Sequence, residues 1–87
     1  MVKVLYVEDE PLQRELVNQL LQLAGIEIQL AENGLEGVEK AKEWIPDVVL
    51  MDIRMPGLNG FETIEKIREI PEIADTPVVV LSAWATS

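Results

Sequence analysis

The sequence contains no cysteine and no histidine. These absences exclude a disulfide framework, a zinc site made of Cys or His, a cysteine nucleophile and a histidine-based catalytic triad. A metal site in this chain must use oxygen ligands, which favour magnesium, calcium or manganese. Basic residues are also scarce, since seven Lys and Arg face sixteen Asp and Glu for a net charge of -9. Because such a chain is repelled by a phosphate backbone, we expect no direct nucleic-acid binding.

Long hydrophobic runs are missing as well. No stretch approaches the length that spans a bilayer, and the N-terminus turns acidic at Glu8, without the features of a signal peptide. We therefore expect no membrane association and a cytoplasmic location. With 87 residues, 48% of them hydrophobic and 26% charged, the chain has the composition of one soluble globular domain, residues 1–87.

Two kinds of hydrophobic pattern alternate along the chain. Short apolar or alternating runs predict four strands, at residues 2–7, 26–30, 48–51 and 78–81. Helical spacing predicts three helices between them: one from Pro11 to a stop at Gly25, one with Asn33 as N-cap and Leu35, Val38 and Ala41 on its apolar face, and one over residues 60–69 with Phe61, Ile64 and Ile67 on one face. This alternation predicts an α/β fold, a doubly wound parallel sheet with right-handed crossovers.

Acidic residues follow two of the predicted strands. Glu8 and Asp9 come directly after the first strand, and Asp52 comes after the third; Ser82 follows the fourth. In open parallel sheets the ligand site lies outside the carboxyl ends of the strands, so the three carboxylates should converge there. Their mutual repulsion would be relieved by a divalent cation such as magnesium, and one carboxylate could then act as a nucleophile towards a phosphoryl group.

Each of these residues also has an ordinary explanation. Glu8 and Asp9 could favour the N-terminus of the first helix through its dipole. Asp52 could merely end a strand, and Ser82 could be a turn residue. The metal-site hypothesis rests on the combination of these residues and on their register with the strand ends.

Two segments carry a resemblance to a known family. The segment Val7-Glu8-Asp9-Glu10-Pro11 and the string LMDIRMPGLNG at residues 50–60 resemble the receiver domain of two-component response regulators, and residues 80–83 (VLSA) match that family's fourth strand. The resemblance covers the whole chain. It implies a flavodoxin-like receiver fold that lacks its last helix, strand and helix, with strand order 2-1-3-4 in place of 2-1-3-4-5.

The resemblance also assigns roles to individual residues. Asp52 would be the phosphoacceptor, taking a phosphoryl group from a histidine kinase or a phosphotransfer protein, and Ser82 would be the switch hydroxyl. Magnesium, for which manganese or calcium can substitute, would be held by Glu8, Asp9, Asp52 and the backbone carbonyl of Arg54. The chain would not be an enzyme in the ordinary sense, although receiver domains assist their own phosphorylation and dephosphorylation.

The early end of the sequence is a departure from the family. The lysine at the end of the family's fifth strand has no counterpart here, which would impair phosphoryl transfer. The fourth strand would become an apolar edge, and one face of the sheet would lose part of its cover. We expect such a chain to associate as a homodimer through this edge and face, with Trp84 or the fourth strand near the contact.

The alternative function is a receiver-derived self-association module whose acidic site at most binds a metal. A phosphatase or a flavin-binding protein fits the sequence less well, because Arg54 stands where a second carboxylate would serve and the first turn is acidic.

Overall fold

The computed structural model describes residues 1–52 and 60–81 of the chain. Within these residues a parallel sheet has the strand order β2-β1-β3-β4. The elements in chain order are β1 (Lys3–Val7), α1 (Pro11–Leu23), β2 (Glu27–Ala31), α2 (Gly34–Trp44), β3 (Val48–Asp52), α3 (Gly60–Arg68), a 3-10 helix η1 (Pro71–Ile73) and β4 (Val78–Leu81). The expected α/β fold and strand order are confirmed.

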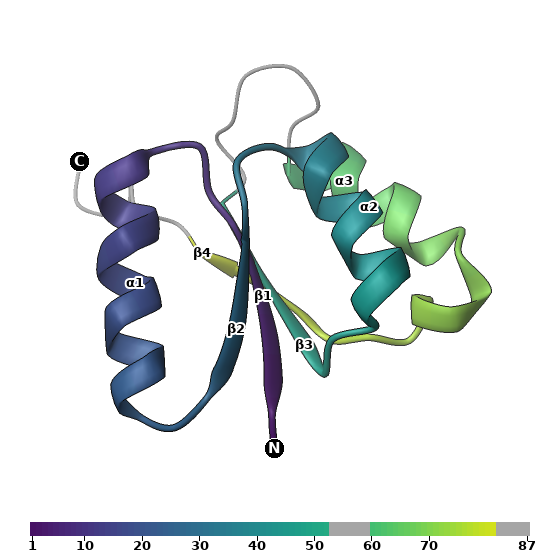
Figure 1. The fold of residues 1–87 in the computed structure, drawn as a ribbon. Helices are drawn as coiled ribbons and strands as arrows, with labels where there is room; N and C mark the ends of the chain where they lie inside the picture. The colour runs from purple at the N-terminus through teal and green to yellow at the C-terminus, as the bar shows by residue number, and fades with distance from the viewer. Residues whose placement is uncertain (53–59, 82–87) are drawn as a thin grey trace.

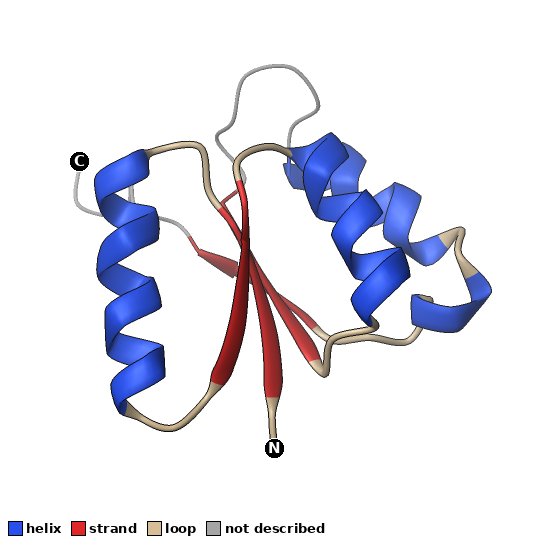
Figure 2. Cartoon of the chain, in the orientation of Figure 1, coloured by secondary structure: helices blue, strands red, loops and turns tan. Residues whose placement is uncertain are grey.

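The described helices form one layer on each face of the sheet. Of the described helices, α2 and α3 cover one face and α1 lies on the other (Figure 1). The three-layer arrangement is plain when the chain is coloured by secondary structure (Figure 2). Since all strands run in the same direction, the carboxyl ends of β1 and β3 lie side by side, with Val7 opposite Met51.

The hydrophobic core lies between the sheet and helices α2 and α3. Its central strand residues are fully buried, and side chains from α2, α3 and η1 close over them. The members of this core are Leu5, Val7, Ala31, Val38, Ala41, Val49, Met51, Ile67 and Ile73. Two sequence expectations were wrong here, because Leu35 and Phe61 are 65% and 63% exposed. The buried face of α3 consists of Gly60, Thr63 and Ile67 instead.

Local signals set the ends of the helices as expected. Asn33 caps α2, its side-chain oxygen accepting a hydrogen bond from the N–H of Glu36 at 2.8 Å. Gly25, just past the end of α1, has a φ of +79°, which a glycine adopts without steric cost. The polar connection before β4 contains a short helix that the sequence pattern did not predict: η1 places Ile73 in the core with 1% of its surface exposed.

The side of the sheet that carries α1 is more open. Among the described residues, α1 packs mainly against β2, and none of its side chains is fully buried. Leu16 and Leu20 on α1 are more than half exposed. Val79 on the edge strand β4 is 46% exposed. The expected apolar edge at β4 is therefore present in the described part of the chain.

Gly37 marks a close approach of α2 to β1. A Cβ atom at this position would lie 2.8 Å from one γ-methyl group of the fully buried Val7. Alanine is favoured over glycine in a helix by about 1 kcal/mol, but overpacking a core costs about 1–3 kcal/mol. We expect Gly37→Ala to lower the free energy of unfolding by about 1 kcal/mol, and to raise it by a similar amount in a Val7→Ala background. Urea unfolding of the four proteins in this cycle tests the sign reversal; the same stabilisation in both backgrounds would contradict the contact.

Candidate functional site

Three carboxylates meet at the carboxyl ends of the two central strands. Glu8 and Asp9 follow the last residue of β1, and Asp52 is the last residue of β3. One oxygen from each side chain lies within 4.8 Å of the other two. The parallel pairing of β1 with β3 produces this convergence, because it brings residues 8–9 and 52 to the same edge of the sheet.

Hydrogen bonds from main-chain N–H groups hold the acidic turn between β1 and α1 in place. The Glu8 N–H extends the sheet by donating to the Ala31 carbonyl at 2.9 Å. The Glu10 N–H donates to the Glu8 carboxylate at 3.2 Å, and the Glu10 carboxylate in turn accepts from the Leu12 N–H at 3.2 Å. Glu10 is thus the N-cap of α1, directly before Pro11 at the first helical position. The dipole interaction considered for Glu8 and Asp9 is a separate effect, and the capping hydrogen bond itself comes from the next residue, Glu10.

Tyr6 supports Glu8 from within the strand. Its phenol O–H donates to the Glu8 carboxylate at 3.0 Å. The two residues are two positions apart, so they point to the same side of β1. Burial raises the pKa of Tyr6 well above its ordinary value, and the hydrogen bond to Glu8 and the nearby carboxylate charges add to this effect. Tyr6 therefore remains a hydrogen-bond donor at any physiological pH. The strand period could have revealed this residue, but the sequence analysis did not single it out.

Glu8 is a buried acid with a strongly raised pKa. Only 5% of its surface is exposed. Its pKa rises from 4.5 to about 7: burial is the main cause, the hydrogen bonds from Glu10 and Tyr6 act against it, and the neighbouring Asp52 also raises it. In the metal-free protein, ionising the whole cluster is therefore unfavourable.

These properties fit a divalent cation. Asp52 is also buried, with 7% of its surface exposed, whereas Asp9 is the most open of the three acids. The donor set is made only of carboxylate oxygens, the ligands that hard ions such as magnesium prefer. Burial is the main cause of the raised pKa of Glu8, and a cation placed between the three side chains would compensate for the lost solvation and balance the negative charge. The residues present thus fit a magnesium ion, and water could reach it past Asp9.

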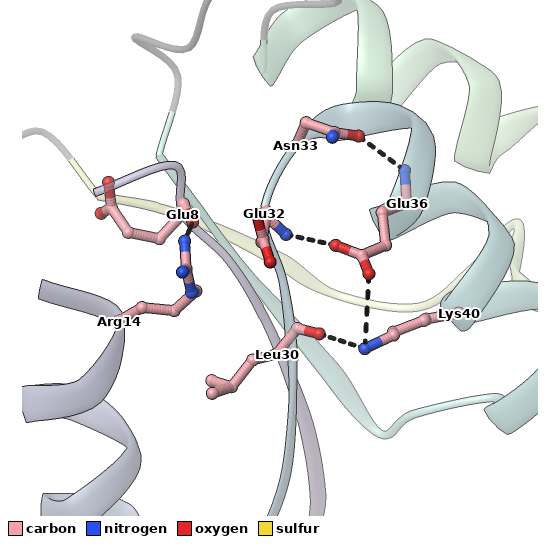
Figure 3. A network of polar contacts seen from close by, with 7 residues as sticks. All are labelled: Glu8, Arg14, Leu30, Glu32, Asn33, Glu36 and Lys40. Atoms are coloured by element: carbon pink, nitrogen blue, oxygen red, sulfur yellow. Dashed lines mark hydrogen bonds and ion pairs between the residues drawn. The ribbon is translucent and has the colours of Figure 1, made fainter. Parts of the chain in front are cut away.

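The remaining site residues expected from the sequence are not among the residues that the structure describes. Arg54 and Ser82, like Trp84, lie outside the described residues. One basic side chain that the site hypothesis did not use does reach the acidic turn: the Arg14 guanidinium donates to the Glu8 main-chain carbonyl at 2.8 Å (Figure 3). Within the described part of the chain, no helix has the length and apolar character that crossing a membrane requires.

Comparison with known proteins places this geometry in a family. A family model described as the response regulator receiver domain matches residues 4–87. Protein PilH of Pseudomonas aeruginosa is 39% identical over 82 residues, which are 94% of this chain and 68% of PilH. A CpxR homolog of Haemophilus influenzae, a transcriptional regulatory protein, is 41% identical, and the match covers 95% of this chain but only 35% of that protein.

A solved structure of a receiver domain has a similar fold. The receiver domain of the sensor histidine kinase PA1611 from Pseudomonas aeruginosa, crystallised with a magnesium ion in its active-site cleft, superposes with a TM-score of 0.90 at 29% identity. The match covers 94% of this chain and 67% of that one. With the fold, the family match and the similarity to PilH in agreement, the chain belongs to the response regulator receiver domain family.

Proposed function

We propose that this chain is a phosphoacceptor receiver, residues 1–87 forming a single receiver unit, in which Asp52 accepts a phosphoryl group with the help of magnesium. The observation that carries the proposal is the convergence of Glu8, Asp9 and Asp52 at the carboxyl ends of β1 and β3. A buried carboxylate at the end of a central strand, beside two further acids, is suited to nucleophilic attack on phosphorus when the surrounding negative charge is balanced.

The reaction can be written from the residues present. An oxygen of the Asp52 carboxylate attacks phosphorus, and an O–P bond forms. The P–N bond of a phosphohistidine breaks, and the electron pair leaves with the imidazole; with an acyl phosphate, the P–O bond breaks and a carboxylate leaves. Glu8 and Asp9 would hold the magnesium ion, which supplies charge neutralisation for the phosphoryl oxygens. Tyr6 and the Glu10 N–H keep the Glu8 carboxylate in place for this role.

Further features of the site come from the family resemblance. The backbone carbonyl of Arg54 would be another metal ligand, and the Ser82 hydroxyl would respond to the phosphoryl group. Manganese or calcium, which also prefer oxygen ligands, would substitute for magnesium. The donor would be a sensor histidine kinase or a phosphotransfer protein in the cytoplasm.

Labelling by a small acyl phosphate tests the proposal. After incubation with acetyl phosphate and magnesium, the intact protein should gain one phosphoryl group by mass spectrometry, and chelation with EDTA should prevent the gain. Peptide mapping of the labelled protein should place the group on Asp52. Protein that is folded by circular dichroism but stays unlabelled at high donor concentration would contradict the proposal.

A second candidate function is self-association. The described residues of β4 form an apolar edge of the sheet, with Val79 46% and Val80 38% exposed, and α1, on one face of the sheet, leaves Leu12, Leu16, Leu20 and Leu23 more than half exposed. Edge strands and uncovered apolar faces favour pairing with a second chain. We propose that two copies associate through the β4 edge and this face. In that case the acidic site would at most bind a metal.

The mass in solution tests the homodimer. We expect sedimentation equilibrium to give a dimer at micromolar concentration, and Val79→Lys to weaken the dimer at least about tenfold, because a lysine on the edge opposes strand pairing. Leu35→Lys is the matched control: Leu35 is also exposed but lies on α2, on the opposite face of the sheet. A monomer at all concentrations, or equal effects of both variants, would contradict this interface.

A further inference from the structure

Arg14 occupies a special position beside the acidic turn. It lies in the first turn of α1 and is half-buried. Its guanidinium Nη1 donates to the main-chain carbonyl of Glu8 at 2.8 Å, and Figure 3 shows the side chain reaching back from α1 to the end of β1. The positive group therefore contacts the backbone of the turn, with a main-chain oxygen as its hydrogen-bond acceptor.

The Glu8 carbonyl needs such a partner because the sheet ends there. The N–H of Glu8 points to β2, where it donates to Ala31. In an extended strand the N–H and C=O of one residue point to the same neighbour, so a ladder continued past Val7 would direct the Glu8 carbonyl towards β2. Ala31 is the last residue of β2, and the chain then turns into α2. A carbonyl removed from water without a donor is costly, and the Arg14 guanidinium supplies a donor to the Glu8 carbonyl where β2 has ended.

The same residue holds the turn at a second point. The main-chain N–H of Arg14 donates to the Glu10 carbonyl at 3.0 Å, which is the first hydrogen bond of α1. Arg14 thus fixes the carbonyls of residues 8 and 10, one on each side of Asp9. We propose that Arg14 is a positioning residue whose guanidinium holds the turn at residues 8–10 in the conformation that brings the Glu8 and Asp9 carboxylates to Asp52. This inference rests on the proposed function for its use, since these carboxylates are the proposed magnesium ligands.

A purely electrostatic role for Arg14 would have the opposite sign. A positive charge beside three carboxylates repels a divalent cation, so its removal would strengthen magnesium binding. Loss of a group that orients the ligands weakens metal binding, typically by 10–100-fold for residues that contact ligands directly. The direction of the change in affinity therefore separates the two roles.

Magnesium titration followed by ¹⁵N–¹H NMR is the test. We expect Arg14→Met to raise the Kd for magnesium about tenfold, and Arg14→Lys, which keeps the charge and one donor group, to recover part of the loss. Lys40→Met is the matched control. Lys40 also donates to a main-chain carbonyl, that of Leu30, and forms an ion pair with Glu36 at 3.8 Å, so these partners belong to β2 and α2 and not to the turn at residues 8–10 (Figure 3). Its loss should change the Kd by less than about twofold.

Amide exchange in the metal-free protein gives a second measurement. The Glu10 N–H, which donates to the Glu8 carboxylate, should exchange about tenfold faster in Arg14→Met, while the core amides of β1 and β3 keep their rates. A Kd that falls or stays the same in Arg14→Met, together with unchanged exchange at Glu10, would overturn the inference. If the wild type binds no magnesium, the proposed metal site fails, and the exchange rate of the Glu10 N–H alone decides the role of Arg14.

Discussion

Replacing Asp52 with asparagine is expected to abolish phosphoryl labelling completely. The substitution keeps the size and shape of the side chain and removes the nucleophilic carboxylate oxygen. Neither Glu8 nor Asp9 should take over, because Glu8 is buried and bonded to Tyr6 and Glu10, and both acids are the proposed ligands of the cation. Intact mass spectrometry after incubation with magnesium and acetyl phosphate should show no adduct.

Asp47→Asn is the matched control for this variant. Asp47 lies just before β3, as Asp52 lies at its end, and its carboxylate accepts a hydrogen bond from the Lys3 N–H at 2.7 Å. This residue is at the opposite end of the strand from the site, so its variant should be labelled as fully as the wild type. Labelling of Asp52→Asn at the wild-type level would show that another side chain accepts the group, and the assignment of Asp52 would be wrong.

Asp52→Asn, which should abolish labelling, should at the same time increase the stability of the metal-free protein. Asp52 is one of the causes of the raised pKa of Glu8, so in the metal-free wild type this neighbour disfavours the ionised form of the buried Glu8 carboxyl. An asparagine carries no charge and can donate its amide hydrogens to the Glu8 carboxylate. We expect Asp52→Asn to raise the free energy of unfolding of the metal-free protein by about 1 kcal/mol near pH 8. A gain in stability with a loss of labelling is typical of functional residues held in an unfavourable environment.

The order of the elements and the place of the site could be predicted from the sequence because simple periodic signals encode them. The β-branched runs, the cap at Asn33 and the stop at Gly25 agree with the packing, and the parallel alternation fixes which strand ends meet. Glu8, Asp9 and Asp52 could therefore be brought together without any coordinates, by the rule that ligands bind at the carboxyl ends of parallel strands.

The orientation of individual side chains was harder to predict. Phe61 is apolar and has the spacing of a core residue, but α3 is rotated so that Thr63 and Ile67 face the core. The hydrophobic pattern of a short helix does not fix its rotation to better than one residue, and tertiary packing decides it. The η1 helix was missed for a similar reason: three residues carry too little periodicity to be seen, although Ile73 completes the core.

The roles of Tyr6 and Arg14 depend on contacts that a pattern does not contain. Tyr6 reads as one more apolar strand residue, and only its geometry shows that its O–H reaches Glu8. In the sequence, Arg14 is indistinguishable from the other polar residues of an amphipathic helix. Its contact with the Glu8 carbonyl depends on where β2 ends beside β1, which is a property of the assembled sheet.

The stability of the metal-free protein should fall as the pH rises from about 4.5 to about 7. Glu8 has a higher pKa in the folded protein than its ordinary value of 4.5, so the folded state binds this proton more tightly than the unfolded state. Its contribution is fully present below pH 4.5 and is lost as the pH passes the folded value near 7. We expect a loss of about 1–3 kcal/mol, or at least about 5 °C in Tm for a domain of this size.

The absence of histidine makes this measurement easy to interpret. Histidine is the side chain whose ordinary pKa lies between pH 5 and 8, and the chain has none, so Glu8 should dominate the pH dependence of Tm in that range. Glu8→Gln, which resembles the protonated acid, should give a flat profile between pH 5 and 7.5. Glu27→Gln, at an exposed position on β2, is the control and should keep the wild-type slope.

Magnesium should reverse the effect where the cluster is ionised. At pH 7.5 the ion binds three carboxylates that otherwise repel one another, so it stabilises the folded state by mass action and raises Tm by several degrees. At pH 5 Glu8 holds its proton, and the ion must displace it, so the same concentration should raise Tm much less. A magnesium effect of equal size at both pH values, or a Tm that rises towards pH 7 without metal, would show that Glu8 is not part of the cation site.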